Sequence, residues 1–79
     1  MERNQVLIQI QEIFREVLDD NDIILTEEIA SNDIEEWDSL THIMLIVDLE
    51  KKFKIKFSSN EILVWKNIGE MIDSIISKL

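Results

Sequence analysis

Hydrophobic residues recur every three or four positions at both ends of the chain, which is the spacing of an amphipathic helix. Near the N-terminus this spacing predicts a helix that ends after Leu18 and buries Val6, Ile10, Ile13, Phe14 and Val17. The aspartates that follow Leu18 would oppose the negative end of the helix dipole. Near the C-terminus a helix is predicted to begin after Asn67, a good N-cap, with Glu70 placed as in a capping box. Its apolar stripe consists of Ile68, Met71, Ile72, Ile75, Ile76 and Leu79.

Two more helical segments are predicted in the middle of the chain. Asp38 is a suitable N-cap for a helix from about Ser39 to Phe53. The polar run Ser58-Ser59-Asn60 caps a short helical turn through Ile62 and Leu63. Between these helices, residues 53–57 alternate like a strand, but a single strand of five residues has nothing to pair with. We therefore expect an extended connector that buries its Phe and Ile side chains.

Residues 19–38 form the long connection between the first two helices. A structureless connection of this length is unusual in a compact domain. It contains apolar residues throughout, so we expect it to be pinned to the core rather than loose: Ile23, Ile24, Leu25, Ile29, Ile34 and Trp37. The prediction is an all-α four-helix bundle with three main helices, one short helix and a long structured first loop, in a single domain over residues 1–79.

Composition indicates a small acidic protein module and excludes several classes of function. The 79 residues carry a net charge of −9, and the excess of acid argues against binding a nucleic-acid backbone. The longest apolar run, Ile43–Val47, is far too short to insert into a membrane, and the N-terminus lacks the pattern of a secretory signal. There is no Cys, which excludes a disulfide framework and a thiolate nucleophile and suits a cytoplasmic location.

The acidic residues are concentrated in the first half of the chain. Residues 1–38 hold 12 acids and 2 bases, whereas residues 39–79 hold 5 acids and 6 bases. The run Asp19-Asp20-Asn21-Asp22 resembles the start of a calcium-binding EF-hand loop. That interpretation fails because Ile23 and Ile24 stand where ligands should continue, and neither the turn Gly nor the closing Glu is present. We interpret these acids as a solvated surface.

The middle helix carries two apolar stripes where a small domain needs only one. Leu45, Ile46, Leu49 and Phe53 fall on one arc, which is the expected core face. Leu40, Met44 and Val47 lie on a different side, with Ile43 beside Ser39. This second stripe is either packed under the long loop, against residues such as Ile29, Ile34 and Trp37, or exposed as a surface for a partner.

Ser39 stands at the start of this helix, beside its cap Asp38. Free backbone N–H groups and the positive end of the helix dipole favour an anion there, so a phosphate ester on Ser39 is well placed. His42 lies one turn away, but a Ser–His hydrolase lacks support, since there is no G-x-S-x-G elbow and no second apolar lobe for a substrate. We expect His42 to be a residue of the helix surface.

The combination of these residues resembles a discrete acyl carrier protein, the small four-helix module that is modified with 4′-phosphopantetheine. The resemblance covers roughly residues 6–79. It rests on Trp37-Asp38-Ser39-Leu40 followed by Ile43, Leu45-Ile46, Leu49-Glu50, Phe53, Ile55 and Phe57. The start of the last helix, Asn67-Ile68 and Glu70-Met71, is also similar, although Thr is commoner than Asn in the family.

This resemblance implies that Ser39 receives the arm from coenzyme A, through a phosphopantetheinyl transferase that uses Mg²⁺. The chain would then be a non-catalytic, monomeric carrier that presents thioester-bound acyl groups to loading and transferring enzymes. Its partner-binding residues would be Asp38, Leu40, Ile43, Met44 and Val47. Acyl chains in this family can retreat between the helices, and the candidates to line such a pocket, each equally well explained as core, the interpretation we favour, are Leu45, Ile46, Leu49, Ile62, Leu63 and Ile68.

The chain departs from carriers of primary fatty-acid synthesis, whose second helix is strongly acidic. Thr41, Met44 and Lys51-Lys52 replace acids, and Asp48 can pair with those lysines, as Glu50 can with Lys54. A dedicated carrier in a polyketide-like, glycan-modifying or other secondary pathway is therefore at least as well supported as a role in fatty-acid biosynthesis. An aminoacyl or peptidyl carrier is the alternative within the family. An unmodified helical adaptor, which would need neither Ser39 nor a transferase, is the alternative outside it.

Overall fold

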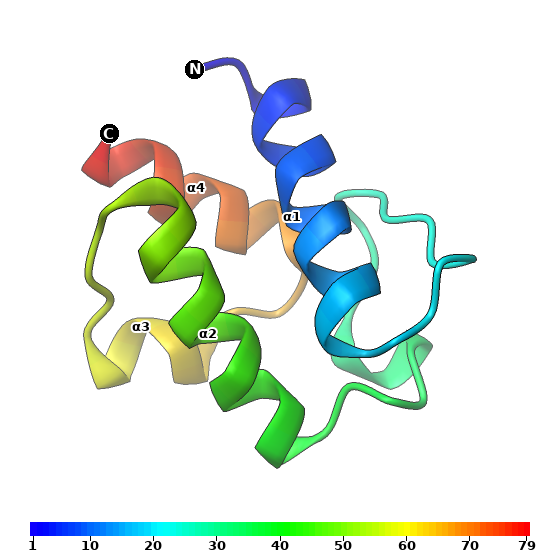
Figure 1. Cartoon of the computed structure of the whole chain (residues 1–79). Helices are drawn as coiled ribbons and strands as arrows, with labels where there is room; N and C mark the ends of the chain where they lie inside the picture. The colour runs from blue at the N-terminus through cyan, green and yellow to red at the C-terminus, as the bar shows by residue number, and fades with distance from the viewer.

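The computed structural model describes residues 1–79 and contains helices and no strand. The helices are α1 (Arg3–Val17), α2 (Ser39–Phe53), α3 (Ser59–Val64) and α4 (Ile68–Lys78), and a 3₁₀ turn, η1 (Ser31–Asp33), lies in the first loop. Figure 1 shows the long loop wrapping around one end of α1 before the chain enters α2. The predicted all-α fold with three main helices and one short helix is confirmed. No helix combines the length and the apolar character needed to span a membrane.

The helices start where local capping chemistry predicts. The side chains of Asp38, Ser58 and Asn67 each accept a hydrogen bond from the backbone N–H three residues later. The capping box expected at α4 is incomplete, because the Glu70 carboxylate accepts from the backbone N–H of Lys66 at 3.1 Å instead of that of Asn67. That contact ties the preceding turn to the helix.

Left-handed residues end the two longest helices. Asp19 has φ of 52° just beyond α1, and the N–H of Asp20 reaches back to the Arg15 carbonyl at 3.0 Å. Lys54 has φ of 57° after α2, and the N–H of Ile55 reaches back to the Glu50 carbonyl at 3.2 Å. These bonds satisfy carbonyls that the helix itself leaves unpaired. The connector, expected over residues 53–57, is shorter at its start and runs over residues 55–58, because Phe53 is the last residue of α2 and Lys54 is left-handed; Ile55 and Phe57 are half-buried.

One hydrophobic core joins the helices and the long loop. α1 packs against both α2 and α4, and no buried side-chain N or O atom lacks a hydrogen-bond partner. On α2 the buried residues are the four predicted from periodicity, Leu45, Ile46, Leu49 and Phe53. The loop contributes three buried side chains, Ile23, Leu25 and Trp37.

The long first loop is held by apolar side chains, as predicted, and also by hydrogen bonds to its backbone and by the 3₁₀ turn η1, which were not predicted. The Leu25 N–H donates to Gln11 Oε1 at 2.8 Å, and Arg15 Nε donates to the Ile23 carbonyl at 2.7 Å. Ile29 and Ile34 are half-buried against the core. The expectation for Ile24 was wrong: its side chain is 71% exposed, because its neighbours Ile23 and Leu25 both face the core and leave it pointing outwards.

The loop is joined to the start of α4 by close backbone contacts. The N–H groups of Ile68 and Gly69 donate to the carbonyls of Ile29 and Glu27, at 2.9 and 2.8 Å. A Cβ on Gly69 would lie 3.3 Å from the Glu27 carbonyl oxygen, so this approach depends on glycine. Arg3 closes the junction from α1 through an ion pair with Glu27 at 2.6 Å.

Candidate functional site

Ser39 is exposed and is the first residue of α2. The capping hydrogen bonds around it are made by its neighbours: the Thr41 N–H donates to Asp38 Oδ1 at 2.9 Å, and the Asp38 N–H donates to Thr41 Oγ1 at 2.8 Å. This reciprocal pair anchors the helix start without using the Ser39 hydroxyl. The hydroxyl is therefore free at the positive end of a 15-residue helix.

The surroundings of Ser39 are acidic on one side. The hydrogen bonds that Asp38 accepts, first of all from the Thr41 backbone N–H, lower the pKa of its carboxyl group. Asp38 therefore stays ionised at neutral pH while it caps the helix. Glu35 and Glu36, two exposed residues just ahead in the loop, add to the negative charge at this end of α2.

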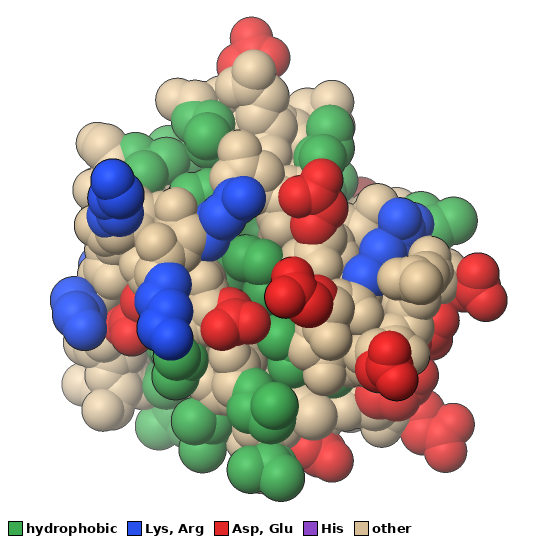
Figure 2. All heavy atoms as spheres, in the orientation of Figure 1, with side chains coloured by type: hydrophobic (Ala, Val, Ile, Leu, Met, Phe, Trp, Pro, Cys, Tyr) green, Lys and Arg blue, Asp and Glu red, His purple; other side chains and the backbone are tan.

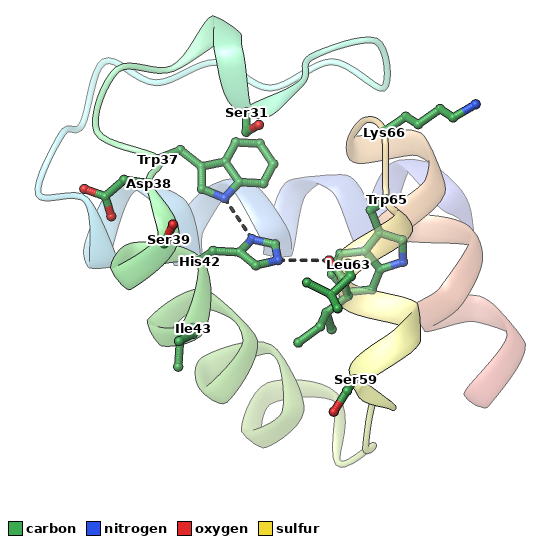
Figure 3. Close-up of a pocket in the computed structure, with 11 residues that line it drawn as sticks. Ser31, Trp37, Asp38, Ser39, His42, Ile43, Ser59, Leu63, Trp65 and Lys66 are labelled. Atoms are coloured by element: carbon green, nitrogen blue, oxygen red, sulfur yellow. Dashed lines mark hydrogen bonds between the residues drawn. The ribbon is translucent and has the colours of Figure 1, made fainter.

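A pocket of about 640 Å³ opens next to Ser39, between the start of α2 and α3 (Figure 3). Ser39 and Asp38 lie on its rim, and aromatic and aliphatic side chains from three segments line it. The apolar lining consists of Trp37, Ile43, Ile62, Leu63 and Trp65. Such a pocket, mostly apolar with a few polar groups at its mouth, suits a flexible ligand that is tethered at the rim.

His42 joins two walls of this pocket. Its Nδ1 accepts a hydrogen bond from Trp37 Nε1 at 3.0 Å, and its Nε2 lies 3.2 Å from the Ile62 carbonyl oxygen in α3 (Figure 3). Since Nδ1 accepts, the neutral ring carries its proton on Nε2 and donates it to that carbonyl. The expectation that His42 is a helix-surface residue was wrong, because its two partners come from the loop and from α3.

Aromatic contacts extend from this histidine through the molecule. Trp37 meets Phe14 edge-on at 4.9 Å between ring centroids, and its ring stacks on His42 at 5.9 Å. On the other side His42 approaches Trp65 at 6.2 Å, and Trp65 meets Phe57 at 5.1 Å. The Trp65 indole N–H donates to Ser74 on α4 at 2.8 Å. These contacts link the pocket wall to α1 and α4.

The lining of the pocket differs from the set expected from the sequence. Ile62 and Leu63 line it as expected. For the other candidates the interpretation as core, which the sequence favoured, is confirmed, because they are buried between α1, α2 and α4: Leu45, Ile46, Leu49 and Ile68. The aromatic lining residues Trp37 and Trp65 were missed, although Trp37 lies only two residues before Ser39 in sequence.

The second apolar stripe of α2 is exposed. Leu40, Ile43, Met44 and Val47, called here the exposed stripe, are 69%, 59%, 47% and 43% exposed. Their alternative position under the long loop is wrong, since Trp37 and the half-buried Ile29 and Ile34 pack against the core instead. The exposed stripe runs along α2 away from Ser39.

The ion pairs expected along α2 are absent. The ion pairs of the chain join Arg3 to Glu27 and Asp73, and Lys78 to Glu61. Glu50 does not pair with Lys54, because its Oε2 accepts from the Phe57 backbone N–H at 2.8 Å. Asp48 pairs with neither Lys51 nor Lys52. The lysines at the end of α2 are thus free of carboxylate partners.

Comparisons with known proteins agree with this geometry. A family model described as "phosphopantetheine attachment site" matches residues 9–75. The chain is similar to holo acyl carrier protein from Geobacter metallireducens, whose solution structure was determined by NMR. The two are 47% identical over 91% of this chain and 83% of that one, with a TM-score of 0.85. No functionally curated protein matches significantly.

The matched region contains nearly the whole bundle, including α2 and the pocket beside it. A family match over most of the chain and a structural relative at this identity also identify the prosthetic group, covalently attached phosphopantetheine. The chain therefore belongs to the phosphopantetheine attachment site family and, within it, is an acyl carrier protein.

Proposed function

We propose that Ser39 carries the 4′-phosphopantetheine and that the chain presents acyl groups to biosynthetic enzymes without catalysing a reaction itself. The observation that supports this most directly is the position of Ser39: an exposed hydroxyl at the start of α2, on the rim of an apolar pocket. When attached, the group supplies the thiol that holds an acyl chain as a thioester. The chain has no Cys, so it offers no competing thiol of its own.

The geometry distinguishes Ser39 from the other serines near the pocket. Ser31 and Ser59 also line it, but they begin a 3₁₀ turn of three residues and a helix of six. Only Ser39 begins a helix long enough to develop a strong dipole, which stabilises the phosphate of a phosphodiester. The nearby Ser58 is engaged, because its Oγ caps α3 by accepting from Glu61.

The pocket fits a group that leaves Ser39. Its mouth holds the polar residues Asp38 and Ser39, and its interior is lined by indole and aliphatic side chains. An acyl chain on the arm would meet the apolar lining, and the phosphate would be stabilised by the free backbone N–H groups at the start of α2 against the repulsion of the Asp38 carboxylate. The Trp37–His42–Ile62 hydrogen bonds hold the two walls at a defined separation.

The partners follow from this role. A phosphopantetheinyl transferase must reach Ser39 past Glu35, Glu36 and Asp38, which favours a basic enzyme surface and a salt-sensitive encounter rate. Acyl-handling enzymes must reach the same end of α2 and would contact the exposed stripe, including Leu40 and Met44. The chain itself would act as a cytoplasmic monomer.

A dedicated secondary pathway accounts for the surface better than primary fatty-acid synthesis. The exposed stripe occupies the face of α2 on which an acidic carrier would display carboxylates, and the lysines that follow it are unpaired. An enzyme adapted to this carrier would rely on apolar contacts at the centre of the interface.

Coexpression with a broad-range phosphopantetheinyl transferase, followed by intact-mass measurement, tests the assignment. Wild type should gain one phosphopantetheine, and Ser39→Ala should gain none while losing less than about 1 kcal/mol of stability, because the hydroxyl makes no capping contact. Ser31→Ala and Ser59→Ala are matched controls on the same pocket and should load normally. Loading of Ser39→Ala would refute the site, and an unloaded wild type would favour an unmodified adaptor.

A further inference from the structure

Most of the positive charge that forms no ion pair is gathered at one end of α2, since Arg15 and Lys66 are the two other unpaired basic residues. Four of the eight basic residues lie within residues 51–56, and all four are exposed: Lys51, Lys52, Lys54 and Lys56. The ion pairs of the protein use Arg3 and Lys78, so none of these lysines is neutralised by a carboxylate. Figure 2 shows Lys and Arg side chains over this end of the helix, with Asp or Glu side chains between them.

Helix stabilisation explains only part of this cluster. Lys51 and Lys52 lie in the last turn of α2, where a cation interacts favourably with the helix dipole. Lys54 is the C-cap of α2 and also lies at the negative end of the dipole, whereas Lys56 lies two residues further on, so the dipole does not account for Lys56. The nearest carboxylate in sequence, Glu50, is held by the Phe57 N–H. Charges that the fold itself does not use are available to a partner.

The cluster continues the exposed stripe. Leu40, Met44, Val47 and Lys51 follow the i, i+4, i+7, i+11 spacing that places residues on one face of a helix. Val47 also lines a shallow hollow of about 490 Å³ together with Ile55, Glu50 and three of the lysines, Lys51, Lys54 and Lys56, so the lysines outnumber the single carboxylate. These three are called the basic end. In Figure 2 apolar side chains cover the part of α2 towards Ser39, and blue side chains adjoin them.

The two ends of this face act independently on a partner. A helix of 15 residues is about 22 Å long, whereas screening at physiological salt limits the range of the interaction between exposed charges to about 8 Å. The acids Glu35, Glu36 and Asp38 at the Ser39 end therefore do not cancel the basic end. A docked surface meets negative charge, then apolar side chains, then positive charge.

We propose, building on the carrier function proposed above, that the basic end receives an acidic patch on the acyl-handling enzyme that covers the exposed stripe. The same lysines repel enzymes whose facing surface is basic, and this repulsion separates the carrier from enzymes of other pathways. The occupant is an enzyme rather than an anionic membrane, because a membrane is an extended negative surface that would face the acids at the Ser39 end as well as the basic end, whereas an enzyme can place its acidic groups opposite the lysines alone. A second copy is disfavoured by the net charge of −9, since two chains repel each other.

The test compares one enzyme with its charge-reversed form. The probes are a β-ketoacyl synthase with a Lys- and Arg-rich carrier-docking surface and the same enzyme with those residues changed to Glu. Binding of holo carrier to each is measured by surface plasmon resonance. Relative to wild type, Lys51→Glu/Lys54→Glu should bind the acidic enzyme about tenfold more weakly and the basic enzyme about tenfold more tightly, because each reversed charge turns attraction into repulsion.

A neighbouring lysine provides the matched control. Lys52 is exposed and lies in the same last turn, but it is rotated about 100° from Lys51 and does not line the hollow. Lys52→Glu makes the same change in charge as Lys51→Glu. Lys51→Glu alone should shift both affinities about threefold, in opposite directions, and Lys52→Glu should shift each less than twofold.

The outcomes separate this inference from the carrier function. Intact mass first shows whether each variant carries phosphopantetheine, and circular dichroism shows whether it is folded. If loaded, folded variants bind both enzymes like wild type, or if Lys51→Glu and Lys52→Glu act alike, the basic end is not a selective contact. Two controls use wild type and Lys51→Glu without an enzyme. If wild type binds phosphatidylglycerol vesicles, or forms dimers in sedimentation velocity, and Lys51→Glu does not, the occupant of the basic end is not an enzyme.

Discussion

The hydrogen bonds of His42 should contribute measurably to stability. Replacement by Ala removes the bond from Trp37 Nε1 and the contact with the Ile62 carbonyl, at 3.0 and 3.2 Å. The indole N–H then borders the open pocket, where water reaches it only in part, since Trp37 is only 9% exposed. Leaving a buried donor unpaired lowers the free energy of unfolding by more than the hydrogen bond had contributed to it.

The expected loss follows from these contacts. Two hydrogen bonds are worth about 0.5–1.5 kcal/mol each, and the stacking of His42 on Trp37 adds about 0.5 kcal/mol. Partial hydration of the open pocket reduces the sum, so we expect about 2 kcal/mol for His42→Ala. In a domain of this size that corresponds to a fall in Tm on the order of 10 °C.

Urea unfolding followed by circular dichroism measures this loss. Ile43→Ala is the matched control, because Ile43 is the next residue on α2 and is exposed, and it should change stability by less than about 0.5 kcal/mol. A double-mutant cycle with Trp37→Phe should give a coupling of about 1 kcal/mol between Trp37 and His42. If His42→Ala costs no more than Ile43→Ala, or if the two changes are additive, the hydrogen bonds do not stabilise the fold.

Two further predictions concern the junction around Glu27. Gly69→Ala should lower the free energy of unfolding by about 1 kcal/mol, because the added Cβ meets the Glu27 carbonyl oxygen at 3.3 Å and this outweighs the better helix propensity of Ala; thermal melting checks this, and an unchanged or higher Tm would contradict it. Acid should also destabilise the protein, since hydrogen bonds formed on folding lower the pKa of three carboxyl groups, Glu27, Asp38 and Glu61. The folded state then binds fewer protons than the unfolded one, so the stability from these groups is present at neutral pH and is lost as the pH falls below about 4. In urea unfolding at pH 5 and pH 3, Glu27→Gln should lose less stability over this interval than Glu28→Gln, an exposed control, and equal losses would contradict the role of the Arg3 hydrogen bond.

The sequence alone determined the helices and the position of the attachment candidate. Helix starts are set by short-range chemistry, so Asp38, Ser58 and Asn67 could be identified as caps from their residue type and spacing. The core face of α2 followed from its periodicity for the same reason, because the spacing of buried positions is a property of the helix itself. Ser39 could be identified as the attachment candidate from its neighbours in sequence, Asp38 and Leu40.

The tertiary structure decided what surrounds these elements. His42 looked like a surface residue because its partners, Trp37 Nε1 and the Ile62 carbonyl, are brought to it by the loop and by α3. Glu50 was expected to pair with Lys54 one turn away, yet the connector presents the Phe57 N–H to its carboxylate instead. That choice leaves Lys54 without its expected partner. A helix is encoded by residues three and four apart, whereas a pocket wall or a free charge depends on which distant segment folds against it.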